Sequence, residues 1–229
     1  MYFDRDIDAI MERTKDRPLP SGRVSASTVL INGIVLTFLG ISIAFLTLDW
    51  LTGLVIFFGF FFDVVIYTIW LKRRTKFSII FGGIAGGLPA MAGRIIITGQ
   101  LDEVGMEFLL FILAWIPVHI LTLALLPKNF EGYKEAKIPM WPVVSSKSQT
   151  MRVIALGAIV SSMTLYRIAH LLKASAIIRI IIFICDLVFL ILVIKNLITP
   201  SNKLTFLIFK IASLYMILGF LSLYLGVVF

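Results

Sequence analysis

Cysteine and charge are both scarce in this chain. Its 229 residues include one cysteine, Cys185, which rules out an internal disulfide framework. Only 15% of the residues are charged, whereas 59% are hydrophobic, and the mean hydropathy is +1.01. These values exclude an ordinary soluble domain and indicate a polytopic membrane protein. The first 27 residues are charged rather than apolar, so we expect no cleavable signal peptide there.

Long apolar runs are abundant, by contrast. Seven of them reach about 20 residues, the length that a helix needs to cross a bilayer. They cover residues 28–48, 50–71, 78–99, 106–126, 151–172, 174–197 and 204–229. We therefore predict an all-α, polytopic membrane helical bundle, with residues 1–229 forming a single integral-membrane domain.

The positive charge is concentrated in three segments between the apolar runs, at about 5–27, 72–77 and 127–150. Lysine and arginine favour cytoplasmic loops, so we predict that these three loops are cytoplasmic and that the protein lies in the plasma membrane. The rule weakens around Arg167, Lys173 and Arg179, which this topology places on the outer side. The formal net charge of +8 reflects topology, and no nucleic acid is needed to explain it.

The densest run of charge lies at the beginning of the chain. If this segment is helical, Asp4, Asp8 and Glu12 line one face with a drift of about 40° per step, while Asp6 points nearly opposite. Carboxylates at that spacing repel one another, which a bound cation would explain. Carboxylate oxygens with retained water are the ligands that Mg²⁺ prefers.

Basic side chains follow these carboxylates directly and are suited to gripping phosphate: Arg13, Lys15 and Arg17. Acidic and basic groups side by side predict a metal-bridged diphosphate. A plainer interpretation also stands, because charged residues at a membrane helix end often only contact water, and acidic residues near a helix start suit its dipole.

The same segment carries a family resemblance. Asp-Arg-Asp-Ile-Asp, followed by Glu-Arg-Thr-Lys-Asp-Arg-Pro-Leu-Pro-Ser-Gly, resembles the first aspartate-rich motif of the UbiA superfamily of intramembrane prenyltransferases. Within that superfamily, the residue pattern most closely resembles the protoheme IX farnesyltransferase (haem O synthase) branch. In that family the motif reads Asn-x-x-x-Asp-x-x-x-Asp; Asp4 and Asp8 match its aspartates, and the Asn would precede Met1. The resemblance implies nine helices, so we expect about two more before this segment.

The second apolar run ends in a basic cluster, Tyr-Thr-Ile-Trp-Leu-Lys-Arg-Arg-Thr at 67–75. By itself such a cluster usually sets topology. It also resembles the family's Tyr-Thr-x-x-Leu-Lys-Arg-Arg-Thr element, which implies that Lys72 and Arg73 bind diphosphate. Asp63 lies within the same run and is expected to face the bundle interior, as substrate contact or as a structural hydrogen-bonding group. The next run pairs small residues four apart at 82–93, which predicts close helix packing.

Two further segments bear on the acceptor and on the metal. His119 follows Trp-x-x-Pro within a span; an isolated buried histidine is often structural, but the resemblance implies haem binding or proton handling. The segment 127–144 ends in Tyr-x-x-Ala-x-Ile-Pro-Met-x-Pro-Val and resembles the second acidic motif of haem O synthases. It suggests Tyr133 at the acceptor and makes Glu131 and Glu135 the expected further metal carboxylates. Relatives commonly carry two adjacent acidic residues where this chain has Glu131 followed by Gly132.

Together these features predict a Mg²⁺-dependent prenyltransferase. Asp4, Asp8 and Glu131 would hold the metal against the diphosphate, and an apolar chamber would shelter the allylic cation. The resemblance implies farnesyl diphosphate as donor, the vinyl group of haem b as acceptor, haem O as product, and a haem A synthase or terminal oxidase assembly as a partner. The alternatives are a UbiA enzyme with a quinone-precursor or glycerol-lipid acceptor and, more remotely, a cation-coupled transporter.

Overall fold

Helices make up all the regular structure of the part of the chain that the computed structural model describes, residues 1–228. The predicted all-α class is therefore confirmed. Two short elements are not α-helical: η1 is a 3₁₀ helix, and η2 is a π-helix that continues α3. In chain order the elements are η1 (Tyr2–Asp4), α1 (Arg5–Ile10), α2 (Ala26–Thr47), α3 (Trp50–Phe60), η2 (Phe61–Leu71), α4 (Ser78–Thr98), α5 (Glu103–Ala124), α6 (Pro127–Glu135), α7 (Trp141–Val144), α8 (Lys147–Leu171), α9 (Ala176–Ile198) and α10 (Asn202–Val228).

Seven of these helical stretches are long and apolar enough to cross a membrane, which confirms the seven predicted spans. They are α2, α3 with η2, α4, α5, α8, α9 and α10. Polar side chains set several of their starting points. Ser25, Asp49, Asp102, Ser146 and Ser175 each precede a helix and accept a hydrogen bond from a backbone N–H in its first turn.

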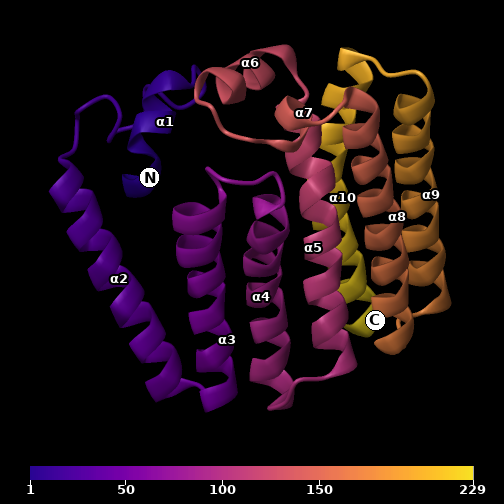
Figure 1. Cartoon of the computed structure of the whole chain (residues 1–229). Coiled ribbons are helices and arrows are strands. Elements are labelled where there is room, and N and C mark those ends of the chain that lie inside the picture. The colour runs from indigo at the N-terminus through magenta and orange to yellow at the C-terminus, as the bar shows by residue number, and fades with distance from the viewer. Residues whose placement is uncertain (229) are drawn as a thin grey trace.

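Helix α5 lies at the centre of the bundle, between α4 on one side and α8 and α10 on the other (Figure 1). Phe111, Val118 and Leu121 on α5 are fully buried, as are Ile154 and Ile168 on α8. Helix α2 stands at the edge, where Phe38 and Leu46 are 72% and 84% exposed. The bundle is therefore most closely packed around α5, and α5 carries several residues of the candidate site.

Glycines let α5 approach its neighbours closely. A Cβ added at Gly87 on α4 would meet the Leu109 carbonyl oxygen at 2.7 Å, and one at Gly157 on α8 would meet the Ala114 oxygen at 2.6 Å. The close packing predicted from the small-residue row at 82–93 is therefore confirmed at α4 and α5.

Replacing Gly87 with alanine is expected to destabilise the protein by about 1–3 kcal/mol, because the methyl group can fit only if the two backbones move apart. Gly93→Ala on the same helix is the matched control, since a Cβ there meets nothing within 4 Å. Thermal unfolding in detergent compares the two variants. A melting temperature for Gly87→Ala as high as that of Gly93→Ala would contradict the packing account.

The short helices α1, α6 and α7 lie at one end of the bundle (Figure 1). The three cation-rich loops gather at this end. Ion pairs from Lys72 to Asp4 and from Arg73 to Asp6 join the first two, and Lys76 donates to the Ser145 hydroxyl of the third at 2.7 Å. The chain therefore concentrates its charged motifs over one mouth of an otherwise apolar bundle.

Candidate active site

A cavity of about 450 Å³ lies beneath α1 and α6, at the end of the bundle where the charged loops meet. Its polar lining balances three carboxylates against three cations, with two tyrosines and one histidine beside them. These residues are Asp4, Asp8, Asp63, Arg13, Arg17, Lys72, Tyr67, Tyr133 and His119. Apolar groups such as Ile79 and Trp115 form the deeper wall.

The N-terminal segment folds back on itself instead of continuing as one helix. Helix α1 ends at Ile10, and Met11 takes an extended conformation with φ −76° and ψ 123°. Met11 is 4% exposed and packs in a small core with Ile7 and Ile138. Burying Met11 breaks the helix, so Glu12 does not share the face of Asp4 and Asp8 as the helical interpretation predicted. Glu12 instead pairs with Lys15 at 2.8 Å on the surface.

Asp8 is fixed at the cavity wall by the fold-back. Its carboxylate is buried and accepts from Arg17 Nη1 at 3.2 Å (Oδ1) and 3.0 Å (Oδ2). The buried Thr14 hydroxyl donates to the Asp8 carbonyl at 2.9 Å, which satisfies a backbone group that the end of α1 leaves free. Both the backbone carbonyl and the carboxylate of Asp8 accept hydrogen bonds, and these contacts hold the carboxylate in one orientation at the cavity.

Asp4 reaches across to the end of η2. Its Oδ2 accepts a hydrogen bond from Lys72 Nζ at 2.7 Å, while its Oδ1 is buried and has no partner within the described residues. A buried carboxylate oxygen without a donor is costly unless something binds it. This oxygen therefore points to a bound cation or water at the cavity.

Arg73 serves as an anchor outside the cavity. Its guanidinium donates to both oxygens of Asp6, at 2.7 and 2.6 Å, and to the Phe3 carbonyl at 2.7 Å. The hydrogen bonds from Arg73 lower the pKa of Asp6 to about 2. Arg73 does not line the cavity, and neither does Lys15, which is occupied by Glu12. Of the cations predicted to grip diphosphate, the structure brings Arg13, Arg17 and Lys72 to the cavity.

The π-helix η2 explains how Asp63, Tyr67 and Lys72 reach one cavity. In an α-helix, residues nine apart lie on opposite faces. A π-helix bonds i to i+5 and has about 4.4 residues per turn, so positions four and nine residues on return to nearly the same face. The Lys72 N–H bonds the Tyr67 carbonyl in this i to i+5 pattern. Asp63, expected to face the bundle interior, therefore lines the cavity. Tyr67 lines it too, although the sequence assigned no role to this tyrosine.

Packing against α4 positions the Tyr67 ring. A Cβ at Gly82 would lie 3.4 Å from this ring, so glycine lets the ring pack directly against the helix backbone. The signal in the sequence was the 4- and 5-residue spacing of Asp63, Tyr67 and Lys72. The nine-residue separation of Asp63 and Lys72 puts both on one face only in a π-helix, which the apolar pattern does not reveal.

His119 lines the cavity from α5 and is held between two aromatic rings. Its ring stacks on Trp115 and on Phe209, with centroids 4.8 and 4.6 Å apart, and its Nδ1 lies 3.3 Å from the Ser213 hydroxyl. Trp115 in turn donates from Nε1 to the Ala212 carbonyl at 2.7 Å. Contacts with α10 therefore fix the ring plane of His119.

Helix α6 presents one predicted residue to the cavity and turns two away. Tyr133 lines the cavity, and burial raises the pKa of its hydroxyl, against the effect of nearby Arg13. Gly132 is buried beside Met11, and Glu131 and Glu135 lie one turn apart on the exposed face. The structure therefore does not assemble the expected metal set of Asp4, Asp8, Glu131 and Glu135, because the inward position of this helix is a glycine.

The carboxylates that do face the cavity suit a hydrated divalent ion shared with a ligand. Within residues 1–228, no three acidic, histidine or cysteine side chains lie close enough to hold a metal alone. Mg²⁺ typically takes one or two carboxylates, several waters and substrate phosphates. Asp4, with its unpartnered oxygen, and Asp8 meet that requirement from the protein side.

An apolar groove of about 570 Å³ adjoins the cavity along α3, η2 and α4. Asp63 and Gly82 line both spaces, so the groove leads away from the charged mouth. Its remaining lining is almost entirely hydrocarbon or glycine: Val55, Ile56, Gly59, Phe60, Val64, Ala85, Gly86 and Pro89. A charged chamber that opens into an apolar groove is suited to an amphiphile with an anionic head.

Comparison with known proteins agrees with this arrangement. Residues 1–214 match the UbiA prenyltransferase family. The chain belongs to this family. UbiA prenyltransferases are generally divalent-metal dependent, and the seven spans make this chain a multi-pass membrane protein.

Three proteins that are similar in sequence are each named protoheme IX farnesyltransferase. The protein of that name from Hyperthermus butylicus is 45% identical over 145 residues, which are 63% of this chain and 48% of the relative. The one from Ehrlichia ruminantium (strain Gardel) is 41% identical over 143 residues, 62% of this chain and 48% of the relative. The chain therefore spans about half the length of these relatives. The Caldivirga maquilingensis protein is 35% identical over 97% of this chain and 78% of its own length.

A solved structure shares the fold, with a TM-score of 0.78. It is described as "Structural and mechanistic insights into the biosynthesis of Digeranylgeranylglyceryl phosphate synthase in membranes". The match covers 99% of this chain and 78% of that one at 19% identity. This neighbour supports the UbiA-type bundle and, at that identity, nothing about the substrate.

Proposed function

We propose that this chain is a Mg²⁺-dependent prenyltransferase that moves a farnesyl group from farnesyl diphosphate to a vinyl group of haem b, giving haem O. The observation that carries the proposal is the charged cavity joined to an apolar groove, with an unpartnered carboxylate oxygen on Asp4. Family membership supports prenyl transfer, and the names of the relatives support haem as acceptor.

The diphosphate head would occupy the cavity. Asp4 and Asp8 would hold Mg²⁺, which neutralises diphosphate oxygens and makes diphosphate a better leaving group. Lys72 and Arg17 now pair with these same two carboxylates, and would donate to phosphate oxygens once the metal takes their place. Arg13 lines the same cavity and makes no ion pair within residues 1–228, so it adds a third donor.

The reaction needs charged groups that stabilise the departing diphosphate, and an apolar wall that keeps water from the allylic cation. The C–O bond to the diphosphate breaks, and the farnesyl carbon forms a new C–C bond with the terminal vinyl carbon. Water then adds its oxygen to the carbon next to the porphyrin and loses a proton to solvent. The apolar wall excludes water until that bond has formed. We place the acceptor beside His119 and Tyr133, at the wall formed by α5 and α6.

The farnesyl tail would lie in the apolar groove. Gly59→Leu is expected to lower the preference for farnesyl over the shorter geranyl diphosphate by about ten-fold, because added carbon atoms shorten the groove. A Cβ at Gly59 meets only Leu88, at 3.8 Å, which is an ordinary van der Waals contact. Gly40→Leu, on α2 with nothing within 4 Å, is the control. Competition between the two donors, measured by product ratio, checks the prediction, and an unchanged ratio in Gly59→Leu would place the tail elsewhere.

An acceptor panel separates this function from the nearest alternative. The purified chain receives farnesyl diphosphate and Mg²⁺ with haem b, with a quinone-precursor phenol or with a glycerol-phosphate lipid, and diphosphate release is followed. Stimulation by haem b alone is expected. Stimulation by the phenol or the glycerol lipid would assign the other UbiA activity, and substrate flux into liposomes without diphosphate release would indicate a transporter.

A further inference from the structure

A second cluster of cations lies at the end of the bundle opposite the candidate active site. Arg167, Lys173 and Arg179 depart from the charge pattern that the loops otherwise follow. Arg167 is neutralised by Glu103 and by Glu107, whose Oε1 lies 3.0 Å from its Nε. Lys173 and Arg179 make no ion pair within residues 1–228.

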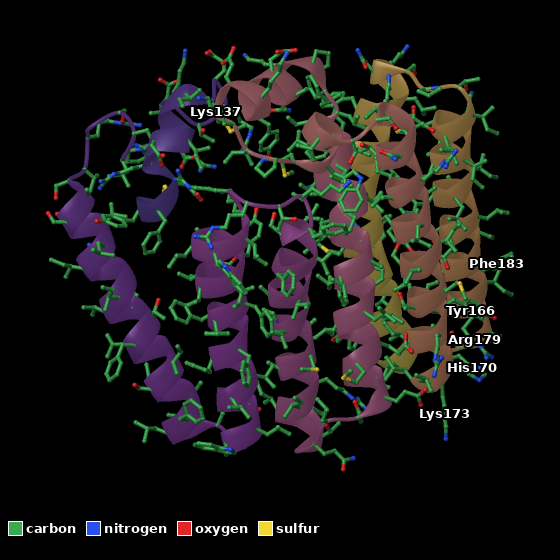
Figure 2. All side chains as sticks on the ribbon, in the orientation of Figure 1. Lys137, Tyr166, His170, Lys173, Arg179 and Phe183 are labelled. Carbon is green, nitrogen blue, oxygen red and sulfur yellow. The ribbon has the colours of Figure 1, made fainter. Side chains whose placement is uncertain are left out.

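Arg179 lines an apolar groove of about 480 Å³ between α8 and α9, and Lys173 lies in the turn that joins these helices. Figure 2 shows Phe183 and Tyr166 further along the two helices, with Arg179, His170 and Lys173 following toward their joined ends. The Tyr166 and Phe183 rings meet edge to face, with centroids 6.4 Å apart. Ile180 lines the same groove and is 58% exposed.

The cationic end of the groove is built for an anion. Arg179 Nη1 lies 3.4 Å from His170 Nδ1. The guanidinium therefore lies beside the imidazole at the groove, and its other N–H groups make no ion pair within residues 1–228. Lys173 adds a second charge from the exposed turn, where its φ of 55° marks a left-handed residue.

We propose that this groove binds an anionic phospholipid. The lipid phosphate would contact Arg179 and Lys173 at the interface, and an acyl chain would lie along Tyr166, Ile180 and Phe183. Cations near the membrane surface attract anionic headgroups, and aromatic side chains are enriched where membrane helices meet the headgroup region. The site is separate from the prenyl diphosphate cavity and does not depend on the proposed transferase activity.

Native mass spectrometry and thermal unfolding of the full chain in detergent test this site. The probes are dioleoylphosphatidylglycerol, dioleoylphosphatidylcholine and inorganic phosphate. We expect phosphatidylglycerol to remain bound and to stabilise the fold, and Arg179→Gln to weaken its binding about five-fold, as loss of one interfacial cation should. Arg152→Gln is the matched control, because Arg152 is exposed on α8 near its other end. It should leave binding unchanged.

A second variant protects the test against misfolding of the first. Lys173→Asn keeps a residue that tolerates positive φ and should also weaken phosphatidylglycerol binding. Equal binding by Arg179→Gln, Lys173→Asn and the native chain would overturn the proposal. Equal stabilisation by phosphatidylcholine would remove the charge selectivity, and equal stabilisation by inorganic phosphate would replace the lipid with a free anion.

Discussion

Asp4→Asn is expected to lower kcat/KM for prenyl transfer by about two to three orders of magnitude. The substitution removes the charge that would hold Mg²⁺ and places an amide where a buried carboxylate oxygen now lacks a partner. It also leaves the positive charge of Lys72 without its partner beside the proposed metal position. A higher Mg²⁺ concentration should therefore be needed for half-maximal activity. The measurement is initial rate against Mg²⁺ and donor concentration.

Asp6→Asn is the matched control for this result. Asp6 lies two residues further along, and its carboxylate pairs with Arg73 while 60% exposed. An exposed ion pair contributes little to the stability of the fold, so the loss in kcat/KM should stay below about five-fold. Equal losses in the two variants would show that Asp4 acts only through the shape of the N-terminal segment.

Lys72→Met is expected to raise the KM for farnesyl diphosphate and to lower kcat/KM for this donor by about 10- to 100-fold. The loss is that of a charged hydrogen bond to phosphate. The KM for haem b should stay unchanged, because Lys72 extends toward Asp4 at the charged mouth. Steady-state kinetics with each substrate varied in turn separates the two effects.

Arg74→Met tests whether positive charge anywhere in the loop is enough to bind the donor. Arg74 belongs to the same basic run, is exposed, and makes no ion pair within residues 1–228. Donor binding by this variant should match that of the native chain. A loss as large as that of Lys72→Met would favour a purely electrostatic attraction of the donor to the loop.

Hydropathy and the small-residue row predicted the framework well. Membrane spans depend on composition over about 20 residues, so the seven helices could be placed without tertiary information. The row around Gly87 predicted a close helix contact because glycine removes the atom that would prevent one. The irregular position of Arg167 finds its explanation in Glu103 and Glu107, which only the packed bundle brings together.

The candidate site was less predictable because its residues depend on departures from regular helices. Met11 breaks α1 when it is buried, which removes Glu12 from the predicted face. The π-helix turns Lys72 toward the cavity and leaves Arg73 to bind Asp6, although the two cations are neighbours in the sequence. Glu131 lies outward because Gly132 packs inward. Local spacing could not distinguish these outcomes.

Product analysis of haem tests the central proposal most directly. The purified chain is incubated with haem b, farnesyl diphosphate and Mg²⁺, with a parallel sample containing EDTA, and the haem is separated by chromatography and weighed by mass spectrometry. The proposal predicts that haem gains the mass of one farnesyl group and one hydroxyl in the sample with Mg²⁺, and stays unmodified in the sample with EDTA. Unmodified haem b in the presence of Mg²⁺, from a preparation that releases diphosphate from the donor, would contradict it.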